Sequence, residues 1–232
     1  MEIKITLVIT TYKRYDTFLK KNLNKYLQNS YIHEIIVSDD CSEDYEKVKD
    51  GFENEIKTGK IKLVRTPKNL GPLKNKIFAC GHAQNEWLCL MDSDNFCDVD
   101  YFEALIEYWN KNGINERIIY SPSVAGKFNF TEFLNTTVDK TNFLSKPIST
   151  FINLGNNVFN KKILEYLLPE YEREFKYIPL EVKYMNYIWI KNGIVIKLVP
   201  NMIYDHVCHD GSFYMHNHVE LHKFEEELDW KI

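Results

Sequence analysis

The sequence predicts an α/β fold in which helices flank a mostly parallel central sheet. Short apolar runs typical of buried strands alternate with segments of helical apolar spacing through residues 3–112. Such alternation is the rhythm of βαβ units, whose strands form a parallel sheet covered by helices. Two of the predicted strands end in closely spaced aspartates. Because open α/β sheets bind ligands at the carboxyl edge of their strands, we expect a functional site there.

The first half of the chain carries the clearest secondary-structure signals. Strands are predicted at residues 5–9, 34–38, 60–64 and 87–91, where apolar residues cluster. Helices are predicted around residues 18–27, 42–57, 69–85 and 99–112. Gly71-Pro72 marks the start of the third helix, and Gly113 ends the fourth.

After Gly113 the alternation becomes less regular. Strands are predicted at 118–122, 124–130 and 194–199, with helices around 161–168 and over 180–191. Residues 131–149 show no clear period, and residues 219–228 have an acidic helical pattern. Neither a low-complexity linker nor an internal repeat divides the sequence. We therefore expect a single domain made of two halves, residues 1–112 and 113–232.

Composition excludes several kinds of partner. The 232 residues include 29 Lys and Arg against 33 Asp and Glu, a formal net charge of −4. This balance does not favour a general nucleic-acid or anionic-membrane surface. We expect no transmembrane segment, because no apolar run approaches the roughly 20 residues that a bilayer requires. The five cysteines form no CxxC pair, which favours a reducing compartment, so we expect a cytoplasmic protein.

Asp92-Ser93-Asp94, directly after the apolar run 87–91, is the most informative motif. Alternation along an extended chain aims Asp92 and Asp94 to the same side. Two hard oxygen donors at that spacing suit Mg²⁺ or Mn²⁺, which fill their other positions with water and substrate phosphate. The motif therefore predicts metal-assisted handling of a diphosphate, although aspartate and serine also occur in ordinary turns.

Four segments at residues 8–12, 35–42, 69–71 and 92–94 carry a family resemblance. They read Val-Ile-Thr-Thr-Tyr, Ile-Ile-Val-Ser-Asp-Asp-Cys-Ser, Asn-Leu-Gly and Asp-Ser-Asp. In this order and spacing they resemble the nucleotide-binding half of family 2 glycosyltransferases with the GT-A fold. The resemblance is looser beyond residue 112, where it continues through Gly155-Asn156-Asn157, Glu181, Gly193 and His206.

The resemblance implies an enzyme that transfers a sugar from a nucleoside diphosphate sugar, usually with inversion at the anomeric carbon. Residues 1–112 would then bind the nucleotide sugar. Residues 113–232 would bind the acceptor, which is a glycan, a lipid-linked compound or another hydroxyl compound. A lipid-linked acceptor would bring the protein to the periphery of a membrane.

Several residues are placed around the donor by this resemblance. Thr10 and Tyr12 close the first strand, where a hydroxyl and an aromatic face can hold a base. Asp40 resembles the family's base-reading aspartate, which accepts the imide N–H of uracil, so a UDP-sugar is the expected donor. For Asp39 we expect a structural role or a place near the ribose, since helix capping is the alternative for this pair. The expected donor-binding residues are Thr10, Thr11, Tyr12, Arg14, Asp40, Lys74, Asp92, Ser93 and Asn156.

The resemblance also implies a cation and a metal ion near the diphosphate. Lys74 stands where the family carries an arginine or lysine that faces the donor, and a solvated helix face shared with Lys76 is the alternative. In the family, Asp92 would lie toward the ribose and Asp94 would coordinate a metal that stabilises the leaving group. The expected cofactor is Mn²⁺ or Mg²⁺, and the expected ligands are Asp94, Asp92 and His206.

The sequence departs from its family at the catalytic base. Glu181 precedes Gly193 by twelve residues, which matches the family's spacing from its acidic pair to the glycine that closes its helix. The family usually has Glu-Asp there, with the aspartate as base, whereas this chain has Glu181-Val182. We expect Glu181 to act as the base, with Asp210 as the other candidate. A first-turn helix charge is the structural alternative for Glu181.

Two segments of the second half admit more than one interpretation. Gly155-Asn156-Asn157 resembles the family's Gly-Asn segment beside the donor sugar, or forms an ordinary turn. Five of the seven histidines lie between residues 206 and 222. A structural zinc site is one interpretation, but the spacing matches no familiar zinc pattern. We favour a role for His206 near the metal and diphosphate, with His209 and Ser212 on a flap.

Two other functions remain open at this stage. A nucleotidyltransferase also joins an α/β sheet to acidic metal ligands, but residues 10–14 lack the glycine that its phosphate loop would need. A catalytically inactive nucleotide-sugar-binding subunit is the second, and Val182 is the main argument for it. Turnover of a donor separates this subunit from an enzyme. The sequence thus predicts a metal-dependent, inverting glycosyltransferase.

Overall fold

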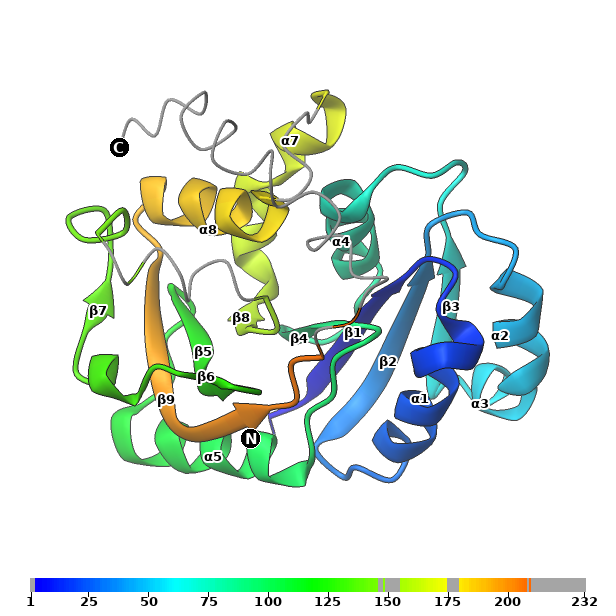
Figure 1. Cartoon of the computed structure of the whole chain (residues 1–232), viewed down its shortest axis with the longest axis horizontal. Helices are drawn as coiled ribbons and strands as arrows, with labels where there is room; N and C mark the ends of the chain where they lie inside the picture. Colours follow the sequence, from blue (N-terminus) through cyan, green and yellow to red (C-terminus); the bar gives the residue numbers. More distant parts are fainter. Residues whose placement is uncertain (1–2, 146–147, 149–154, 175–179, 208, 210–232) are drawn as a thin grey trace.

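The computed structural model (Figure 1) describes residues 3–145, 148, 155–174, 180–207 and 209. Within these residues nine strands form one sheet, in the order β3-β2-β1-β4-β8-β5-β9-β7, and β6 pairs with β5. Helices flank the sheet, which confirms the predicted α/β fold. The predicted helix at residues 219–228 and the candidate base Asp210 lie outside the described residues.

The first half forms a parallel sheet. Its strands are β1 (Ile5–Thr11), β2 (Ile32–Asp39), β3 (Ile61–Arg65) and β4 (Trp87–Asp92). β1 pairs in parallel with both β2 and β4, and β2 pairs in parallel with β3. Every residue of β1 is buried, as expected for a central parallel strand covered on both faces. All four predicted strands of this half are confirmed.

The helices of this half match the prediction except where tertiary contacts divide them. The π-helix η1 (Tyr15–Leu19) leads directly into α1 (Lys20–Tyr26), and α4 (Pro72–Gly81) and α5 (Val99–Asn112) follow β3 and β4. The helix predicted over 42–57 is instead two helices, α2 (Tyr45–Gly51) and α3 (Glu53–Lys57). The break lies at Phe52, whose side chain is buried against Tyr15. The Tyr15 hydroxyl also fills the space that a side chain at Gly51 would need.

The second half extends the sheet with mixed pairing. β8 (Val158–Asn160) lies antiparallel between β4 and β5 (Ile118–Ala125), and β9 (Val195–Tyr204) pairs in parallel with β5. The strand predicted over 124–130 is wrong, because Gly126 has φ +54° and turns β5 into β6 (Phe128–Asn129). β7 (Thr137–Val138) pairs antiparallel with β9. The 3₁₀ helices are η2 (Thr131–Phe133) and η3 (Lys161–Tyr166), and the α-helices are α7 (Leu168–Glu172) and α8 (Glu181–Lys191).

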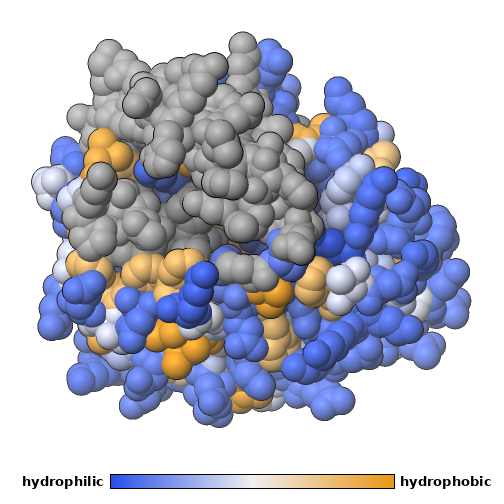
Figure 2. Space-filling model, viewed as in Figure 1, coloured by the Kyte–Doolittle hydropathy of each residue, from blue (hydrophilic) through white to orange (hydrophobic). Residues whose placement is uncertain are grey.

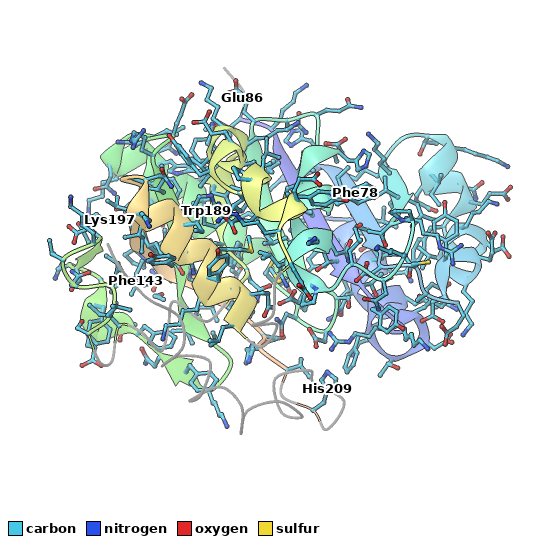
Figure 3. All side chains as sticks on the ribbon, turned by 90° about the horizontal axis from the view of Figure 1, so that it is seen from above. Phe78, Glu86, Phe143, Trp189, Lys197 and His209 are labelled. Carbon is cyan, nitrogen blue, oxygen red and sulfur yellow. The ribbon has the colours of Figure 1, made fainter. Side chains whose placement is uncertain are left out.

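α4 packs on the parallel strands of the first half and also against α8 of the second half. α4 contacts β1 and β2 as well as α7 and α8. α8 is anchored by Trp189, which is buried, packs on Phe159 of β8 and donates a hydrogen bond from Nε1 to the Ile163 carbonyl at 2.9 Å. Figure 3 shows α8 crossing the molecule with Trp189 along it. The two halves therefore meet through the packing of α4 against α8 as well as through the pairing of β4 with β8.

Polar side chains cover much of the surface. Hydrophilic residues dominate the right side of the face in Figure 2, and apolar residues gather in a smaller area at its lower centre. None of the helices in the described residues has the length and apolar character needed to cross a membrane.

Candidate functional site

The predicted donor residues of β1, β2 and β4 meet at the carboxyl edge of the sheet. The register pairs Thr10 with Asp92 on one side and with Ser38 on the other, and it pairs Thr11 with Asp39. This is the convergence expected of parallel strands. Tyr12 follows β1 and is 42% exposed, so its ring is accessible to a planar ligand.

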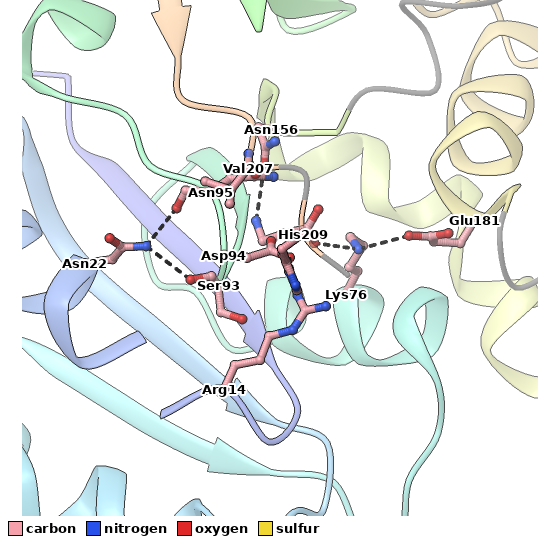
Figure 4. Close-up of polar contacts among 11 residues, drawn as sticks. Arg14, Asn22, Lys76, Ser93, Asp94, Asn95, Asn156, Glu181, Val207 and His209 are labelled. Carbon is pink, nitrogen blue, oxygen red and sulfur yellow. Dashed lines mark hydrogen bonds and ion pairs between the residues drawn. The ribbon is translucent and has the colours of Figure 1, made fainter. Parts of the chain in front are cut away.

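The Asp-Ser-Asp segment is held by main-chain and amide contacts. The Ser93 N–H donates to the Thr10 carbonyl at 3.3 Å. Nδ2 of Asn22, on α1, donates to the carbonyls of Ser93 at 3.2 Å and Asn95 at 3.1 Å (Figure 4). Asn22 and Asn95 are both buried. Asn22, which no motif in the sequence indicated, therefore fixes the loop that carries the two carboxylates.

Two cationic or potentially cationic side chains converge on Asp94. Arg14 Nη1 lies 2.6 Å from Asp94 Oδ2, and His209 Nε2 lies 3.1 Å from the same oxygen (Figure 4). The Asp94 side chain is 9% exposed and that of Arg14 is 23% exposed. The ring of Phe18 packs on His209 with 4.8 Å between centroids. The structure thus brings Arg14, expected near the donor, and Asp94, expected at the metal, into direct contact.

His206 and His209 reach this region because the chain after β9 pairs with the loop after β4. Phe96 and Asp205 form an isolated β-bridge, and the Val207 N–H donates to Asn95 Oδ1 at 3.0 Å. His206 packs against Phe128, and its Nδ1 lies 3.4 Å from the Tyr204 hydroxyl. Burial lowers the pKa of His206, although the nearby Asp92 and Asp94 charges oppose this shift. The histidine in contact with Asp94 is therefore His209, whereas the sequence favoured His206 as a metal ligand.

Lys76, on α4, is the buried cation of the site. Its side chain is 3% exposed, and Nζ lies 2.8 Å from Asp92 Oδ1 and 3.4 Å from Glu181 Oε1. The face of α4 that carries Lys76 is therefore buried, whereas Lys74, for which a solvated face was the alternative, is only partly buried. Leu73, Ile77 and Cys80 are also buried, and their spacing from Lys76 puts all four on one face of α4. That spacing was the sequence signal that could have identified Lys76.

Lys74 lies elsewhere on α4. Its Nζ is 5.9 Å from the centre of the Tyr171 ring. It borders a cavity of about 210 Å³ lined by residues 68–74 and Glu174. The lysine of α4 that contacts Asp92 and Glu181 is Lys76, and the role of Lys74 at the donor stays a prediction.

The pKa values of the two carboxylates beside Lys76 are shifted in opposite directions. Burial would lower the pKa of Lys76, but the Asp92 and Glu181 charges reverse this and raise it above its usual value. Burial also opposes ionisation of Asp92, yet Lys76 brings the net pKa of Asp92 below its usual value. For Glu181, burial dominates and raises the pKa, with a further increase from Asp92. Glu181 is therefore the more basic carboxylate of the pair.

Asp40 holds a loop through three hydrogen bonds. Its Oδ1 accepts from the Thr66 hydroxyl and the Leu70 N–H, both at 2.8 Å, and Oδ2 accepts from the Gly71 N–H at 2.9 Å. A carboxylate oxygen has two acceptor positions, so Oδ2 retains one for a ligand. Asp39 is fully buried and accepts from the Ser42 N–H at 2.7 Å, which gives it a structural role.

Asn156 and Val182 bring the second half of the chain to the same edge. Asn156 Oδ1 accepts from the Asp92 N–H at 2.9 Å, and the Asn156 carbonyl accepts from the Tyr101 hydroxyl at 2.7 Å. A Cβ at Gly155 would lie 3.3 Å from Val182 Cγ2 and 3.7 Å from Asp92 Oδ2. The apolar residue that follows Glu181 therefore packs beside Asp92.

Buried polar atoms without partners occur at three of the predicted donor residues. Among the residues that the structure describes, Thr11 Oγ1, Ser93 Oγ and Asn156 Nδ2 have no hydrogen-bond partner. Buried polar groups are normally satisfied, and leaving one unpaired costs about 1–3 kcal/mol. All three atoms belong to residues at this edge of the sheet.

The donor set at Asp94 fits a hard divalent cation. Carboxylate oxygens and an imidazole nitrogen are suitable ligands for Mn²⁺, and His209 Nε2 already lies beside Asp94 Oδ2. Arg14 occupies the same oxygen, so a metal ion bound at Oδ2 would compete with Arg14. Within the described residues, no three His, Cys, Asp or Glu side chains form a ready-made metal site. Cys208, His216 and His218, considered for zinc, lie outside those residues.

Comparison with solved structures shows the fold. S. aureus TarS 1-349 in complex with UDP-GlcNAc superimposes with a TM-score of 0.66 at 14% identity, covering 91% of this chain and 60% of that one. GalNAc-T7 with UDP, GalNAc and Mn²⁺ gives a TM-score of 0.63 at 14% identity, covering 98% and 50%. These similarities confirm the predicted GT-A architecture.

Sequence comparison identifies the family. The succinoglycan biosynthesis protein ExoO of Rhizobium meliloti (strain 1021) is 26% identical over 103 residues, which are 44% of this chain and 29% of ExoO. This chain thus spans less than two thirds of the length of ExoO, TarS 1-349 or GalNAc-T7. Residues 6–168 match Glycosyl transferase family 2. Because this match covers more than half of the chain, the protein belongs to glycosyl transferase family 2, a family of glycosyltransferase enzymes.

Proposed function

We propose that the protein transfers a sugar from a UDP-sugar to an acceptor hydroxyl with inversion at the anomeric carbon. The observation that carries this proposal is the chain of contacts from Asp92 through Lys76 to Glu181, with 2.8 and 3.4 Å between the charged atoms. It links the proposed donor side of the site to the proposed base through one buried cation. Membership of glycosyl transferase family 2 supports the reaction class.

The donor would lie along the carboxyl edge of β1, β2 and β4. Tyr12 is accessible for stacking on the base, and Asp40 Oδ2 has an acceptor position for an imide N–H. The unpaired hydroxyls of Thr11 and Ser93 and the unpaired amide of Asn156 supply further hydrogen bonds. The TarS structure is a complex with UDP-GlcNAc and the GalNAc-T7 structure one with UDP, which supports the choice of nucleotide for testing.

A divalent cation, Mn²⁺ or Mg²⁺, would be held by Asp94 and His209, with Asp92 beside it. Bound there, it supplies Lewis-acid stabilisation of the departing diphosphate. The chain's own cations contribute as well, because Arg14 and Lys76 lie at Asp94 and Asp92 respectively. His209 takes the place of His206 in this assignment, since it is the imidazole in contact with Asp94.

Glu181 would act as the general base. Its carboxylate removes the proton of the acceptor hydroxyl as that oxygen forms a bond to the anomeric carbon. The bond from the anomeric carbon to the β-phosphate oxygen breaks, and its electron pair leaves with UDP. Burial raises the pKa of Glu181, which makes it a stronger base than an exposed glutamate. Lys76 holds the side chain in place before and after proton transfer.

The acceptor is proposed to bind in the second half of the chain, residues 113–232, as a glycan, a lipid-linked compound or another hydroxyl compound. The donor is proposed to bind in residues 1–112 of the same domain. The cysteine pattern supports a cytoplasmic location.

Release of UDP from a panel of UDP-sugars tests the proposal. Each sugar is incubated with the protein, Mn²⁺ and a mixed panel of hydroxyl acceptors, and proton NMR reports the anomeric configuration of the product. We expect release with one donor class and an inverted product. Glu181→Gln should lose this turnover, whereas Glu103→Gln, at an exposed position on α5, should retain it. Tight UDP binding without any turnover would instead identify an inactive nucleotide-sugar-binding subunit.

A further inference from the structure

One carboxylate oxygen of the site serves two donors at once. Asp94 Oδ2 accepts from Arg14 Nη1 at 2.6 Å and lies 3.1 Å from His209 Nε2. An arginine to carboxylate contact of this length is a strong, charge-assisted hydrogen bond. Arg14 therefore occupies one of the two Asp94 oxygens at which the proposed divalent cation would bind.

The two cations of the site differ in how firmly they are held. Lys76 is almost fully buried and contacts two carboxylates, on β4 and α8. Arg14 is 23% exposed, and among the described residues its guanidinium pairs with Asp94. Lys76 is thus fixed by its surroundings, whereas Arg14 can exchange one anionic partner for another without exposing a buried charge.

The backbone next to Arg14 is strained in a way that points to function. Lys13 has φ +56°, and Arg14 precedes the π-helix η1, which begins at Tyr15. Positive φ is unfavourable for lysine, and π-helical turns are rare and often occur at functional sites. This turn directs Arg14 back across the carboxyl edge of β1 to Asp94.

We propose that Arg14 is an exchangeable counter-ion that occupies the cation position at Asp94 in the free protein and moves to the donor's diphosphate when a divalent cation takes that position. This inference rests on the proposed function, since it presupposes that a nucleoside diphosphate and a metal ion bind here. A metal ion that arrived alone would leave Arg14 beside it without an anion. The diphosphate provides that anion.

Binding of metal and binding of nucleotide must then favour each other. The metal ion frees Arg14 to contact phosphate, and the phosphate compensates Arg14 after it leaves Asp94. Such coupling is reciprocal, so each ligand increases the affinity of the protein for the other by the same factor. Arg14 would account for a large part of this coupling between the metal ion and the nucleotide.

The test measures the binding of Mn²⁺ to the whole chain, with and without UDP. Electron paramagnetic resonance reports the concentration of free Mn²⁺. Arg14→Ala removes the competitor, so Mn²⁺ alone should bind about tenfold more tightly, the effect of one charge-assisted hydrogen bond. UDP should bind more weakly to Arg14→Ala, and the coupling between the two ligands should shrink. Arg14→Lys, which keeps the charge, should retain part of the coupling. Lys57→Ala is the matched control, because it removes an exposed charge that pairs with Glu53 on α3, outside the site.

Equal or weaker binding of Mn²⁺ alone by Arg14→Ala would overturn the exchange, as would undiminished coupling in that variant. Unchanged melting temperatures separate these outcomes from loss of the fold. Failure of the proposed function looks different, because the unmodified protein would then neither bind UDP with Mn²⁺ nor turn over any UDP-sugar. If the unmodified protein binds UDP and Mn²⁺ cooperatively and Arg14→Ala shows the same coupling, the exchange of Arg14 is refuted. The proposed function is not refuted by that result.

Discussion

At the scale of single residues, the buried charge of Lys76 leads to a specific prediction about stability. Removing one member of a buried charge cluster leaves the others uncompensated and typically costs about 3–5 kcal/mol. Lys76→Met should therefore lower the free energy of unfolding by about 3 kcal/mol in urea titrations at pH 7, by leaving Asp92 and Glu181 without their cation. Lys74→Met, on the same helix but beside Tyr171, should change it by less than about 1 kcal/mol. Equal losses in the two variants would contradict the assignment.

Glu181 makes a prediction about pH. A base must be ionised, and burial raises the pKa of Glu181 above the usual 4.5. As the pH falls through that raised pKa, Glu181 gains a proton, so kcat/KM should decline at a higher pH than an exposed glutamate would allow. Glu181→Gln should lower turnover by about 10²–10⁴-fold with UDP affinity nearly unchanged. Normal turnover in Glu181→Gln, or a product that retains the donor's configuration, would be incompatible with this role.

Asp40 makes a prediction about base choice. Losing a charged hydrogen bond costs about 1.5–3 kcal/mol, so Asp40→Asn should weaken UDP binding by about tenfold or more. The same substitution disturbs the loop that the Asp40 carboxylate holds at Leu70 and Gly71. Thr66→Val separates these effects, because it removes one loop contact of Asp40 and leaves its charge. Calorimetric titration with UDP and GDP measures both, and tighter GDP than UDP binding in the unmodified protein would rule out the assignment.

At the scale of elements, local pattern predicted strands and helices where local burial determines them. β1 is apolar and buried along its whole length, so its sequence is sufficient to identify it. The break between α2 and α3 depends on Tyr15, which is distant in sequence, and on the space it takes at Gly51. Similarly, the choice between His206 and His209 depends on how residues 205–207 pair with residues 95–96. Long-range pairing of this kind leaves no periodic signal.

Gly126 connects an element to the site. Its φ of +54° strains any other residue, and a Cβ there would lie 2.9 Å from the His206 carbonyl oxygen. Gly126→Ala should lower the free energy of unfolding by about 2–3 kcal/mol and weaken Mn²⁺ binding through displacement of His206 and His209. Gly59→Ala is the matched control, because Gly59 has a similar φ of +78° with open space around it. It should lose only about 1 kcal/mol. Equal losses at the two glycines would show that the contact with His206 does not matter.

At the scale of the whole molecule, the candidate site joins both halves of the chain. β8 lies between β4 and β5 and brings Asn156 to Asp92, and α8 brings Glu181 to Lys76. The sequence predicted the carboxyl edge of β1, β2 and β4 because parallel strands place their ends together. It missed Lys76 as the buried cation, because isolated lysines are usually solvated. Only the packing of α4 against both β4 and α8 shows that two carboxylates compensate the charge of Lys76.

The measurement that tests the account most directly is calorimetric titration of the unmodified protein with UDP, in Mn²⁺ and in EDTA. The central claim is that the edge defined by Asp92 and Asp94 binds a nucleoside diphosphate together with a divalent cation. We expect UDP to bind more tightly in Mn²⁺ than in EDTA, and Asp94→Ala to remove the difference while the melting temperature shows an intact fold. Equal UDP affinity in Mn²⁺ and in EDTA would contradict the claim.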